Sequence, residues 1–335
     1  LVKPNLLTAR EPEKAVTTHP QVVRAILRIL KKRGARPSVA DSPSNVTRLE
    51  ELWARTGFRA LCDEEQVPLL NLEREGSVPF TVNGLSFSIA QPVLKADVII
   101  SVPKVKSHVL TILTGAVKNM YGTVPGFQKT SLHKRCPTPA QFGGLMAAIY
   151  SKAKPHLSIA DGIVGMDGDG PAGGEPVKMG FLAASADAVA LDRVLCDILR
   201  IDPRHVPTFK ALRNLGLGES DLERIEVTGA AVRDVMPKSF RVPSALRGRM
   251  IPGWLVGILG PLVWIRPGFT DRCISCGLCV KSCPVEALTI APKQKPILDG
   301  RTCIGCCCCH EVCPAKAIIM TQSPLLNFAR RGRLP

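Results

Sequence analysis

Cysteines are the residues of this 335-residue chain with the clearest capacity for chemistry. Ten of its 13 cysteines lie between Cys273 and Cys313. Eight of these ten form two copies of the pattern C-x2-C-x2-C-x3-C-P, and the flanking sequences CPVEALTI and CPAKAIIM repeat as well. The eight are Cys273, Cys276, Cys279 and Cys283 in the first copy, and Cys303, Cys306, Cys309 and Cys313 in the second. A duplication of this kind predicts a small module with pseudo-twofold symmetry.

The spacing has a physical reason. Three closely spaced thiolates can wrap three corners of a 4Fe-4S cubane, and the cysteine before each proline points away toward the other cluster. We therefore predict two 4Fe-4S clusters in a ferredoxin-like domain, with crossed ligands. One cluster takes Cys273, Cys276, Cys279 and Cys313, and the other takes Cys303, Cys306, Cys309 and Cys283. Zinc is disfavoured, because a structural zinc site uses four ligands, commonly in two CxxC pairs.

Two further cysteines stand inside the second copy. Cys307 and Cys308 occupy the positions that Gly277 and Leu278 hold in the first copy. We interpret them as inert residues packed over the cluster, and a redox or alternative-ligand role is the second interpretation.

The charge of the chain is strongly basic and uneven. The formal net charge is +16, and residues 231–335 contain 15 basic and 5 acidic side chains. This balance favours an acidic partner, such as an electron-donor protein, a membrane surface, a nucleic acid or a phosphorylated substrate, and a solvated basic surface is the plain alternative. Aromatic residues make up 4% of the chain, which disfavours a nucleic-acid platform built on base stacking. Cysteines spaced as metal ligands indicate a reducing, cytoplasmic interior.

The first 230 residues alternate helical and strand patterns. We expect an α/β domain with a mostly parallel sheet and helices on both faces. The chain opens on LVKPNLL without a methionine, which reads as the end of a strand whose preceding piece is missing. Helices are predicted over 19–34, 44–58 and 187–199, and strands over 37–41, 96–103, 156–161 and 222–229.

The remaining residues divide into three parts. Residues 231–268 are predicted to be a linker, 269–322 the small α+β ferredoxin-like domain, and 323–335 a basic tail. Within the linker, 250–265 is uncharged and apolar, but it is shorter than the roughly 20 residues of a membrane-spanning helix and contains Pro252 and Pro261. A strap buried against the main domain is our interpretation, and peripheral membrane contact is the alternative.

The first polar stretch in the α/β domain follows the strand at 96–103. It contains Lys104, Lys106, His108, Lys118 and Asn119 in a loop and the helix after it. Such a group could bind an anion or transfer protons, while a solvated basic loop is the plain alternative.

The second and third stretches lie further along. Asp161, Asp167 and Asp169 fall in or beside a glycine-rich loop, which could hold a divalent cation or an anion, or simply form a turn. The loop matches neither the dinucleotide fingerprint nor the P-loop. Residues 127–136, with Lys129 and His133, are a candidate lid over an acidic substrate.

These stretches together resemble a known family. PKVKSHVLTILTGAVKNMYGTVPG, DGIVGMDGDGPAGG and DAVALDRV, followed by the doubled cysteine motif, are similar to the iron–sulfur centre proteins that carry domain of unknown function 362. The resemblance implies an α/β domain coupled to a two-cluster electron-transfer domain. The positions that match the family's motif residues are Lys104, Lys106, His108, Lys118, Asn119, His133, Asp161 and Asp167.

Two functions follow as hypotheses. The first is a ferredoxin-type oxidoreductase that takes electrons from a redox partner protein and passes them to an anionic substrate in the α/β domain. The alternative is a non-catalytic electron carrier or redox-complex subunit, steered to its partner by the basic charge. A nucleic-acid-modifying enzyme is a third hypothesis, which predicts that nucleic-acid binding depends steeply on salt concentration.

Overall fold

A computed structural model describes residues 1–43, 48–243 and 264–324. The predicted strap at 250–265, apart from Trp264 and Ile265, and nearly all of the predicted basic tail at 323–335 lie outside the described residues. No helix in the described ranges is both long enough and apolar enough to cross a membrane.

The α/β domain is built on one large sheet. Its strands follow the order β3-β2-β1-β6-β9-β7-β8, and β10 pairs with β9. The pairs from β3 through β6 to β9 and β7 are parallel, whereas β8 and β10 are antiparallel additions, so the predicted mostly parallel sheet is confirmed. The strands are β1 (Val2–Pro4), β2 (Val39–Ala40), β3 (Leu69–Leu70), β6 (Ile100–Val102), β7 (Lys104–His108), β8 (Ile112–Thr114), β9 (Leu157–Asp167) and β10 (Glu175–Ser185). A separate hairpin consists of β4 (Ser77–Val82) and β5 (Leu85–Ala90).

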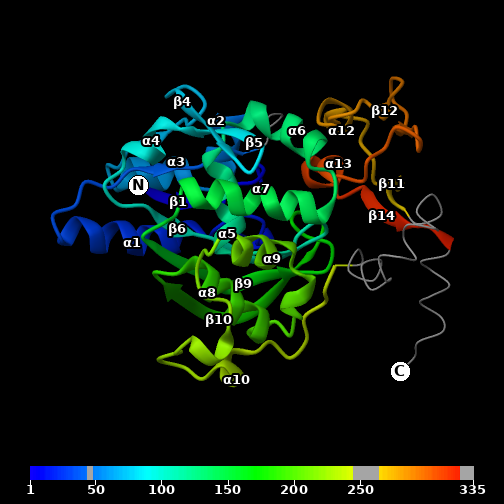
Figure 1. Cartoon of the computed structure of the whole chain (residues 1–335). Helices are drawn as coiled ribbons and strands as arrows, with labels where there is room; N and C mark the ends of the chain where they lie inside the picture. Colours follow the sequence, from blue (N-terminus) through cyan, green and yellow to red (C-terminus); the bar gives the residue numbers. More distant parts are fainter. Residues whose placement is uncertain (44–47, 244–263, 325–335) are drawn as a thin grey trace.

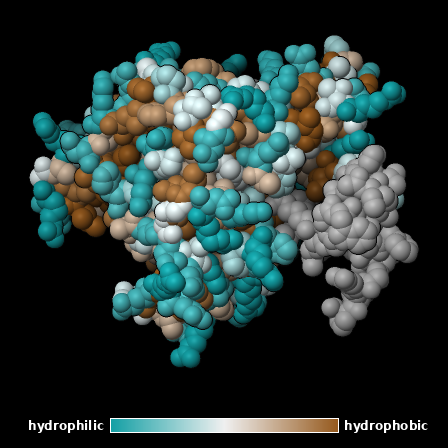
Figure 2. Space-filling model, viewed as in Figure 1, coloured by the Kyte–Doolittle hydropathy of each residue, from teal (hydrophilic) through white to brown (hydrophobic). Residues whose placement is uncertain are grey.

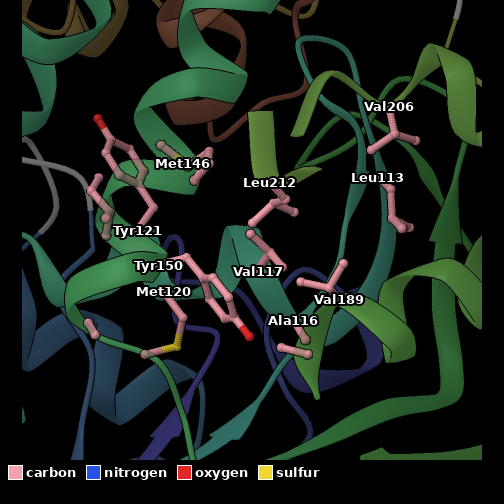
Figure 3. Packing of buried hydrophobic residues seen from close by; sticks show 14 of the residues in the cluster. Leu113, Ala116, Val117, Met120, Tyr121, Met146, Tyr150, Val189, Val206 and Leu212 are labelled. Carbon is pink, nitrogen blue, oxygen red and sulfur yellow. The ribbon is translucent and has the colours of Figure 1, made fainter. Parts of the chain in front are cut away.

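Helices cover the sheet in two groups, each with its own hydrophobic core (Figure 1). One core joins the first three helices to β1, β2 and β6, and the other joins α5 and α7–α9 to the rest of the sheet. In Figure 3, side chains of α5, α7 and α9 point toward one another in this second core. The helices are α1 (Pro20–Lys32), α2 (Leu49–Arg55), α3 (Phe58–Glu64), α4 (Gln91–Lys95), α5 (Ala116–Asn119), α6 (Gly126–Arg135), α7 (Pro139–Lys152), α8 (Ala188–Ile198), α9 (Pro207–Asn214) and α10 (Val232–Val235).

Local sequence explains where the main helices begin. The side chain of His19 accepts a hydrogen bond from the backbone of Gln21 at the start of α1. Thr138 and Gln141 form a reciprocal capping box at α7, and the carboxylate of Asp187 accepts from two backbone amides at the start of α8. These caps satisfy backbone donors that a helix N-terminus otherwise leaves unpaired.

The expected strand at 222–229 is wrong. Leu222–Arg224 form a short 3-10 turn, and the residues after it pair with no strand that the structure describes. Leu222 and Ile225, three positions apart, both pack on the α/β core, which suits a turn better than the two-residue period of a strand. The chain then continues across this domain, because Val232, Val235 and Phe240 also pack on that core.

The C-terminal domain is small and α+β, as predicted. β11 (Ile265–Phe269) pairs with β14 (Ile318–Gln322), and β12 (Leu288–Thr289) pairs with β13 (Ile297–Leu298), all antiparallel. Each cysteine motif contributes one short helix, α12 (Leu278–Lys281) or α13 (Cys308–Val312). Figure 1 shows this domain, coloured orange to red, beside α6 and α7. On the face shown in Figure 2, hydrophilic side chains cover most of the α10 end of the molecule and apolar ones gather in small groups.

Candidate functional site

The cysteines of the C-terminal domain line two separate cavities of about 340 Å³ each. We call the four in the first cavity the outer cysteine set and the four ligand-pattern cysteines in the second the inner cysteine set. The outer cysteine set is Cys273, Cys276, Cys279 and Cys313. The inner cysteine set is Cys283, Cys303, Cys306 and Cys309. Each set therefore joins three cysteines of one motif to the last cysteine of the other.

The residues around these cavities fit an iron–sulfur cubane. Backbone amides of Ala287 and Ala317 donate to the sulfurs of Cys283 (3.3 Å) and Cys313 (3.2 Å), which favours thiolates. Burial raises the pKa of Cys279 to about 11, so its ionised form needs a cationic centre beside it. Across the described residues, no three ligating side chains converge on a single ion, as a structural zinc site requires. A cubane instead takes one cysteine per iron.

The two sets differ in exposure. Cys276 of the outer set is exposed, and its neighbour Ile274 is 64% exposed. Cys306 and Cys309 of the inner set are buried, and Cys307 beside them packs with Val109 of the α/β domain. The outer set thus faces solvent, while the inner set lies on the side of the α/β domain.

Helix α13 and the segment after it make the contacts between the domains. Arg10 donates to the backbone carbonyl of Cys313 at 2.5 Å, and Lys316 donates to the carbonyl of Gly174 at 2.8 Å. His108 Nε2 lies 3.2 Å from Glu311 Oε1, and both side chains are largely buried. The second cysteine motif is therefore held directly against β7 and the glycine-rich loop.

A cleft of about 700 Å³ lies where the two domains meet, and both domains contribute to its walls. From the C-terminal domain come Ser282, Cys308, Glu311 and Val312. From the α/β domain come Asn5, Leu6, Leu7, Asp41, Ser42, Pro43, Lys118, Asn119, Tyr121, Gly122, Lys129, Thr130 and His133. Of the eight predicted α/β site residues, Lys118, Asn119 and His133 line this cleft.

The lysines of the cleft differ in their partners. Lys129 donates to the backbone carbonyls of Ser42 and Pro43, and burial lowers its pKa to about 8. Lys118 makes no hydrogen bond or ion pair within the described part of the chain. Burial lowers the pKa of Lys118, and the negative charge of Glu311 partly restores it. Lys118 is therefore a cation that a ligand can approach.

Two other polar atoms in the cleft walls have no partner. Ser42 is 3% exposed and His133 is 4% exposed, yet Ser42 Oγ and His133 Nδ1 make no hydrogen bond. The His133 ring stacks on Phe142 with centroids 4.5 Å apart, which fixes its plane. Burial lowers the pKa of His133 to about 4, so the imidazole is neutral near pH 7.

His108 has a defined tautomer. Its Nδ1 accepts hydrogen bonds from the backbone of Leu110 (3.0 Å) and Thr111 (3.3 Å), so the proton of the neutral ring lies on Nε2, facing Glu311. Burial lowers the pKa of His108 to about 3. For Glu311, burial favours the neutral acid, but His108 and the nearby positive charge of Lys118 outweigh it and hold the pKa near 2. A neutral imidazole thus faces a carboxylate across the domain interface.

The other predicted residues lie behind the cleft. Lys104 and Lys106 are 1% and 0% exposed on β7, so the solvated-loop alternative is wrong. Lys104 pairs with Asp161 at 2.8 Å, and Lys106 donates to Asn5 Oδ1 at 2.7 Å. Asn5 lines the cleft, so Lys106 contributes to the cleft only indirectly, by holding the side chain of Asn5.

The glycine-rich loop serves packing, and its aspartates are not brought together. Asp167 binds Arg241 through both carboxylate oxygens, whereas Asp161 binds Lys104. A Cβ on Gly173 would lie 2.4 Å from His310 Nε2 of α13, so glycine permits the close approach of the two domains there. The residues do not form a divalent cation site of three aspartates.

Several residues of the cleft have no local sequence pattern that marks them as part of a site. Glu311 lies between two cysteine ligands and looks like an ordinary helix residue, and Cys308 was interpreted as inert. Asp41 ends the predicted strand at 37–41 and Ser42 follows it, a position that suits a turn but also a site, because α/β sites usually form at the carboxyl ends of parallel strands. That position was a usable signal for these two, because Asp41 forms an ion pair with Lys3 at 2.8 Å beside the cleft.

Comparison with known proteins agrees with this architecture. Residues 1–197 match the family described as domain of unknown function (DUF362), and residues 269–289 match the 4Fe-4S binding domain. A thylakoid-associated protein of Synechocystis sp. is 34% identical over 250 residues, which cover 73% of this chain and 76% of that protein. The lactate racemase apoprotein of Thermoanaerobacterium thermosaccharolyticum is 15% identical with a TM-score of 0.38, covering 60% of this chain and 48% of the other, a likeness too weak to carry an argument. The chain thus belongs to the DUF362 family and is an iron–sulfur protein with a 4Fe-4S binding domain.

Proposed function

We propose that this protein is an iron–sulfur oxidoreductase that passes electrons from a redox partner protein to a small organic substrate held in the cleft between its domains. The observation that carries the proposal is the shared wall of that cleft. Cys308 lines the cleft and lies between Cys306 and Cys309 of the inner cysteine set in helix α13 and the turn before it. A ligand in the cleft therefore lies next to the residues that hold iron and sulfide.

We assign one 4Fe-4S cluster to each cysteine set. When bound, such clusters accept and release one electron each at potentials set by their surroundings. Cys276 and Ile274 give a redox partner protein access to the outer set, while α13 keeps the inner set next to the cleft. Iron and sulfide counts of about eight each per chain would support two clusters, and about four would contradict the assignment.

The chain's own groups suit a reductive reaction. Lys118 can orient an anionic substrate and can also release a proton, because burial lowers its pKa. Neutral His133 holds one ring proton in the cleft wall, and His108 holds one on Nε2, facing Glu311, behind the same wall. The walls of the two domains limit access of water to the reacting group.

A location at a membrane surface is part of the proposal. The curated relative is described as thylakoid-associated, and the net charge of +16 favours anionic surfaces. We propose the cytoplasmic side for this surface, because ligand-spaced cysteines favour a reducing interior.

Oxygen-free reoxidation of the reduced, cluster-loaded protein tests the function. Small organic oxidants that bind the cleft should reoxidise the wild type, and Lys118→Ala should slow this by about tenfold or more, because a charged contact contributes about 1.5–3 kcal/mol. Lys210→Ala, outside the cleft, is the matched control and should behave like the wild type. Equal rates in all three proteins, with unchanged cluster spectra, would instead favour a non-catalytic electron carrier.

A further inference from the structure

The unpartnered polar groups of the cleft belong to three different segments of the α/β domain. Ser42 follows β2, Lys118 lies in α5 and His133 lies in α6. Ser42 Oγ and His133 Nδ1 are buried without a hydrogen bond, and Lys118 has no partner in the described ranges. Buried polar atoms without partners are costly, by about 1–3 kcal/mol each, and in a native site they mark a place where a ligand completes the bonding.

The charge around these groups favours an anion. Lys3 is neutralised by Asp41, whereas Lys129 is held by carbonyl oxygens and Lys118 by nothing described. The nearby carboxylate of Glu311 already faces His108. Lys118 and Lys129 therefore place two ammonium groups on the wall formed by α5 and α6, where a negative oxygen is attracted more strongly than in water. A bound cluster adds negative charge only on the opposite wall, behind α13.

The remaining walls are suited to an organic group. Leu6, Leu7, Pro43 and Val312 contribute apolar surface, and the ring of Tyr121 also lines the space. In Figure 3 the Tyr121 hydroxyl points away from the labelled core residues, so this ring belongs both to the core and to the cleft wall. A cleft with apolar walls and a few converging polar groups is typical of a small-molecule site.

We propose that the cleft binds a small organic oxyanion, a carboxylate or a phosphate ester, with its charged oxygens on Lys118 and Ser42 and its apolar part against Leu6 and Val312. This inference rests on the proposed function, because it names the substrate class of the same cleft. His133 is a positioning residue at the charged end, with its ring plane set by Phe142. Lys104 and Lys106 stay outside the binding contacts, since other residues already hold both ammonium groups.

Binding of three matched probes to the cluster-loaded full chain tests the inference. Benzoate and phenyl phosphate carry the two candidate oxyanions on the same ring, and benzyl alcohol is the neutral control. We expect at least one of the anions to bind in calorimetry and raise the melting temperature, and the stronger of the two identifies the oxyanion. Benzyl alcohol binding as tightly as both anions would overturn the inference.

Variants of Lys118 and Ser42 test which residues of the cleft bind the anion. Lys118→Gln should weaken anion binding about tenfold to a hundredfold, Lys118→Arg should restore most of it, and Ser42→Ala should weaken it about threefold to tenfold. Lys210→Gln is the control and should bind like the wild type. Unchanged affinity in a folded Lys118→Gln protein with intact cluster absorbance would overturn the inference. Binding of these redox-inert anions, together with no reoxidation of the reduced protein by any small organic oxidant, would instead contradict the proposed function and leave this inference standing.

Discussion

Two adjacent cysteines of the second motif have different environments. Cys307 occupies the left-handed region at φ 65°, where the first motif has Gly277 at φ 72°, and its side chain packs against Val109 and Met320. Cys308 lines the cleft and interacts electrostatically with Cys306. Packing against the other domain thus offsets a backbone conformation that costs a non-glycine residue of the order of 1 kcal/mol. The interpretation of both cysteines as inert neighbours describes Cys307 better than Cys308.

This difference gives a prediction at the level of one thiol. Cys308→Ala removes a thiol that interacts electrostatically with Cys306, and a polar S–H group beside a ligand sulfur stabilises the more negative, reduced form of a cluster. The reduction potential of the cluster held by the inner cysteine set should therefore fall. Cys307→Gly is the matched control, because glycine is the residue of the first motif at this position, and it should leave that potential near the wild-type value. Redox titration followed by electron paramagnetic resonance distinguishes the two, and equal shifts would contradict the assignment.

At the level of elements, the start of α5 is fixed by a side chain from α8. The carboxylate of Asp192 accepts hydrogen bonds from the backbone amides of Ala116 (2.5 Å) and Val117 (3.0 Å). A Cβ on Gly115 would lie 2.0 Å from the carboxylate oxygen, so the glycine leaves room for this contact. Because α5 also carries Lys118 and Asn119, a buried contact on the side of the hydrophobic core positions two cleft residues.

Asp192 should also make stability depend on pH. Burial raises its pKa to about 7, against the two amide hydrogen bonds that favour the ionised form. The folded protein therefore binds this proton more tightly than the unfolded chain, whose aspartates titrate near pH 4, so the stabilisation is present below about pH 4 and is lost as the pH rises to about 7. Between pH 6 and 7 the free energy of unfolding should fall by about 1 kcal/mol. Urea unfolding of the α/β domain measures this fall.

Asp192→Asn tests the cause. The asparagine does not titrate, so the fall in the free energy of unfolding between pH 6 and 7 should disappear in this variant. Asp192→Ala should also lose the pH dependence, and it should cost about 2–4 kcal/mol because it leaves two buried amides without an acceptor. A wild-type slope that persists in Asp192→Asn would assign the pH dependence to another group.

Patterns within single elements could be predicted from the sequence, whereas contacts between distant segments could not. The runs around Ile100 and Leu157 predicted central strands because buried parallel strands are continuously apolar. The basic residues of β7 looked like a loop, since nothing local shows that Lys104 meets Asp161, 57 positions away. Glu311 could not be predicted for the same reason, because the residue it faces, His108, belongs to the other domain. The second cysteine motif supplies part of the cleft wall only in the folded chain, where α13 lines the same space as α5 and α6.

At the level of the whole molecule, charge should govern the encounter with the redox partner. The chain carries a net charge of +16, and two exposed basic residues flank the first cysteine motif: Arg272 precedes Cys273, and Lys281 lies two residues after Cys279. Reduction by an acidic electron-carrier protein should therefore slow by about tenfold between roughly 0.01 M and 0.5 M salt, since screening weakens steering over long distances. Stopped-flow absorbance measures the rate.

Charge reversal near the outer cysteine set separates steering from general charge effects. Arg272→Glu with Lys281→Glu should lower the low-salt rate and flatten the salt dependence, whereas Lys210→Glu, with the smaller charge change and remote from the outer set, should do neither. A salt dependence that is identical in both variants would place the docking surface elsewhere.

The hydrogen bond from Arg10 to the Cys313 carbonyl links the first residues of the chain to a cysteine more than 300 positions later. This contact constrains the order of folding and cluster insertion during biosynthesis. The α/β domain leaves the ribosome first and can complete its two cores before the second cysteine motif exists. Iron and sulfide, however, must reach Cys306 and Cys309 before α13 settles on that finished surface and buries them. The maturation machinery therefore has to act between translation of the cysteine motifs and closure of the two domains.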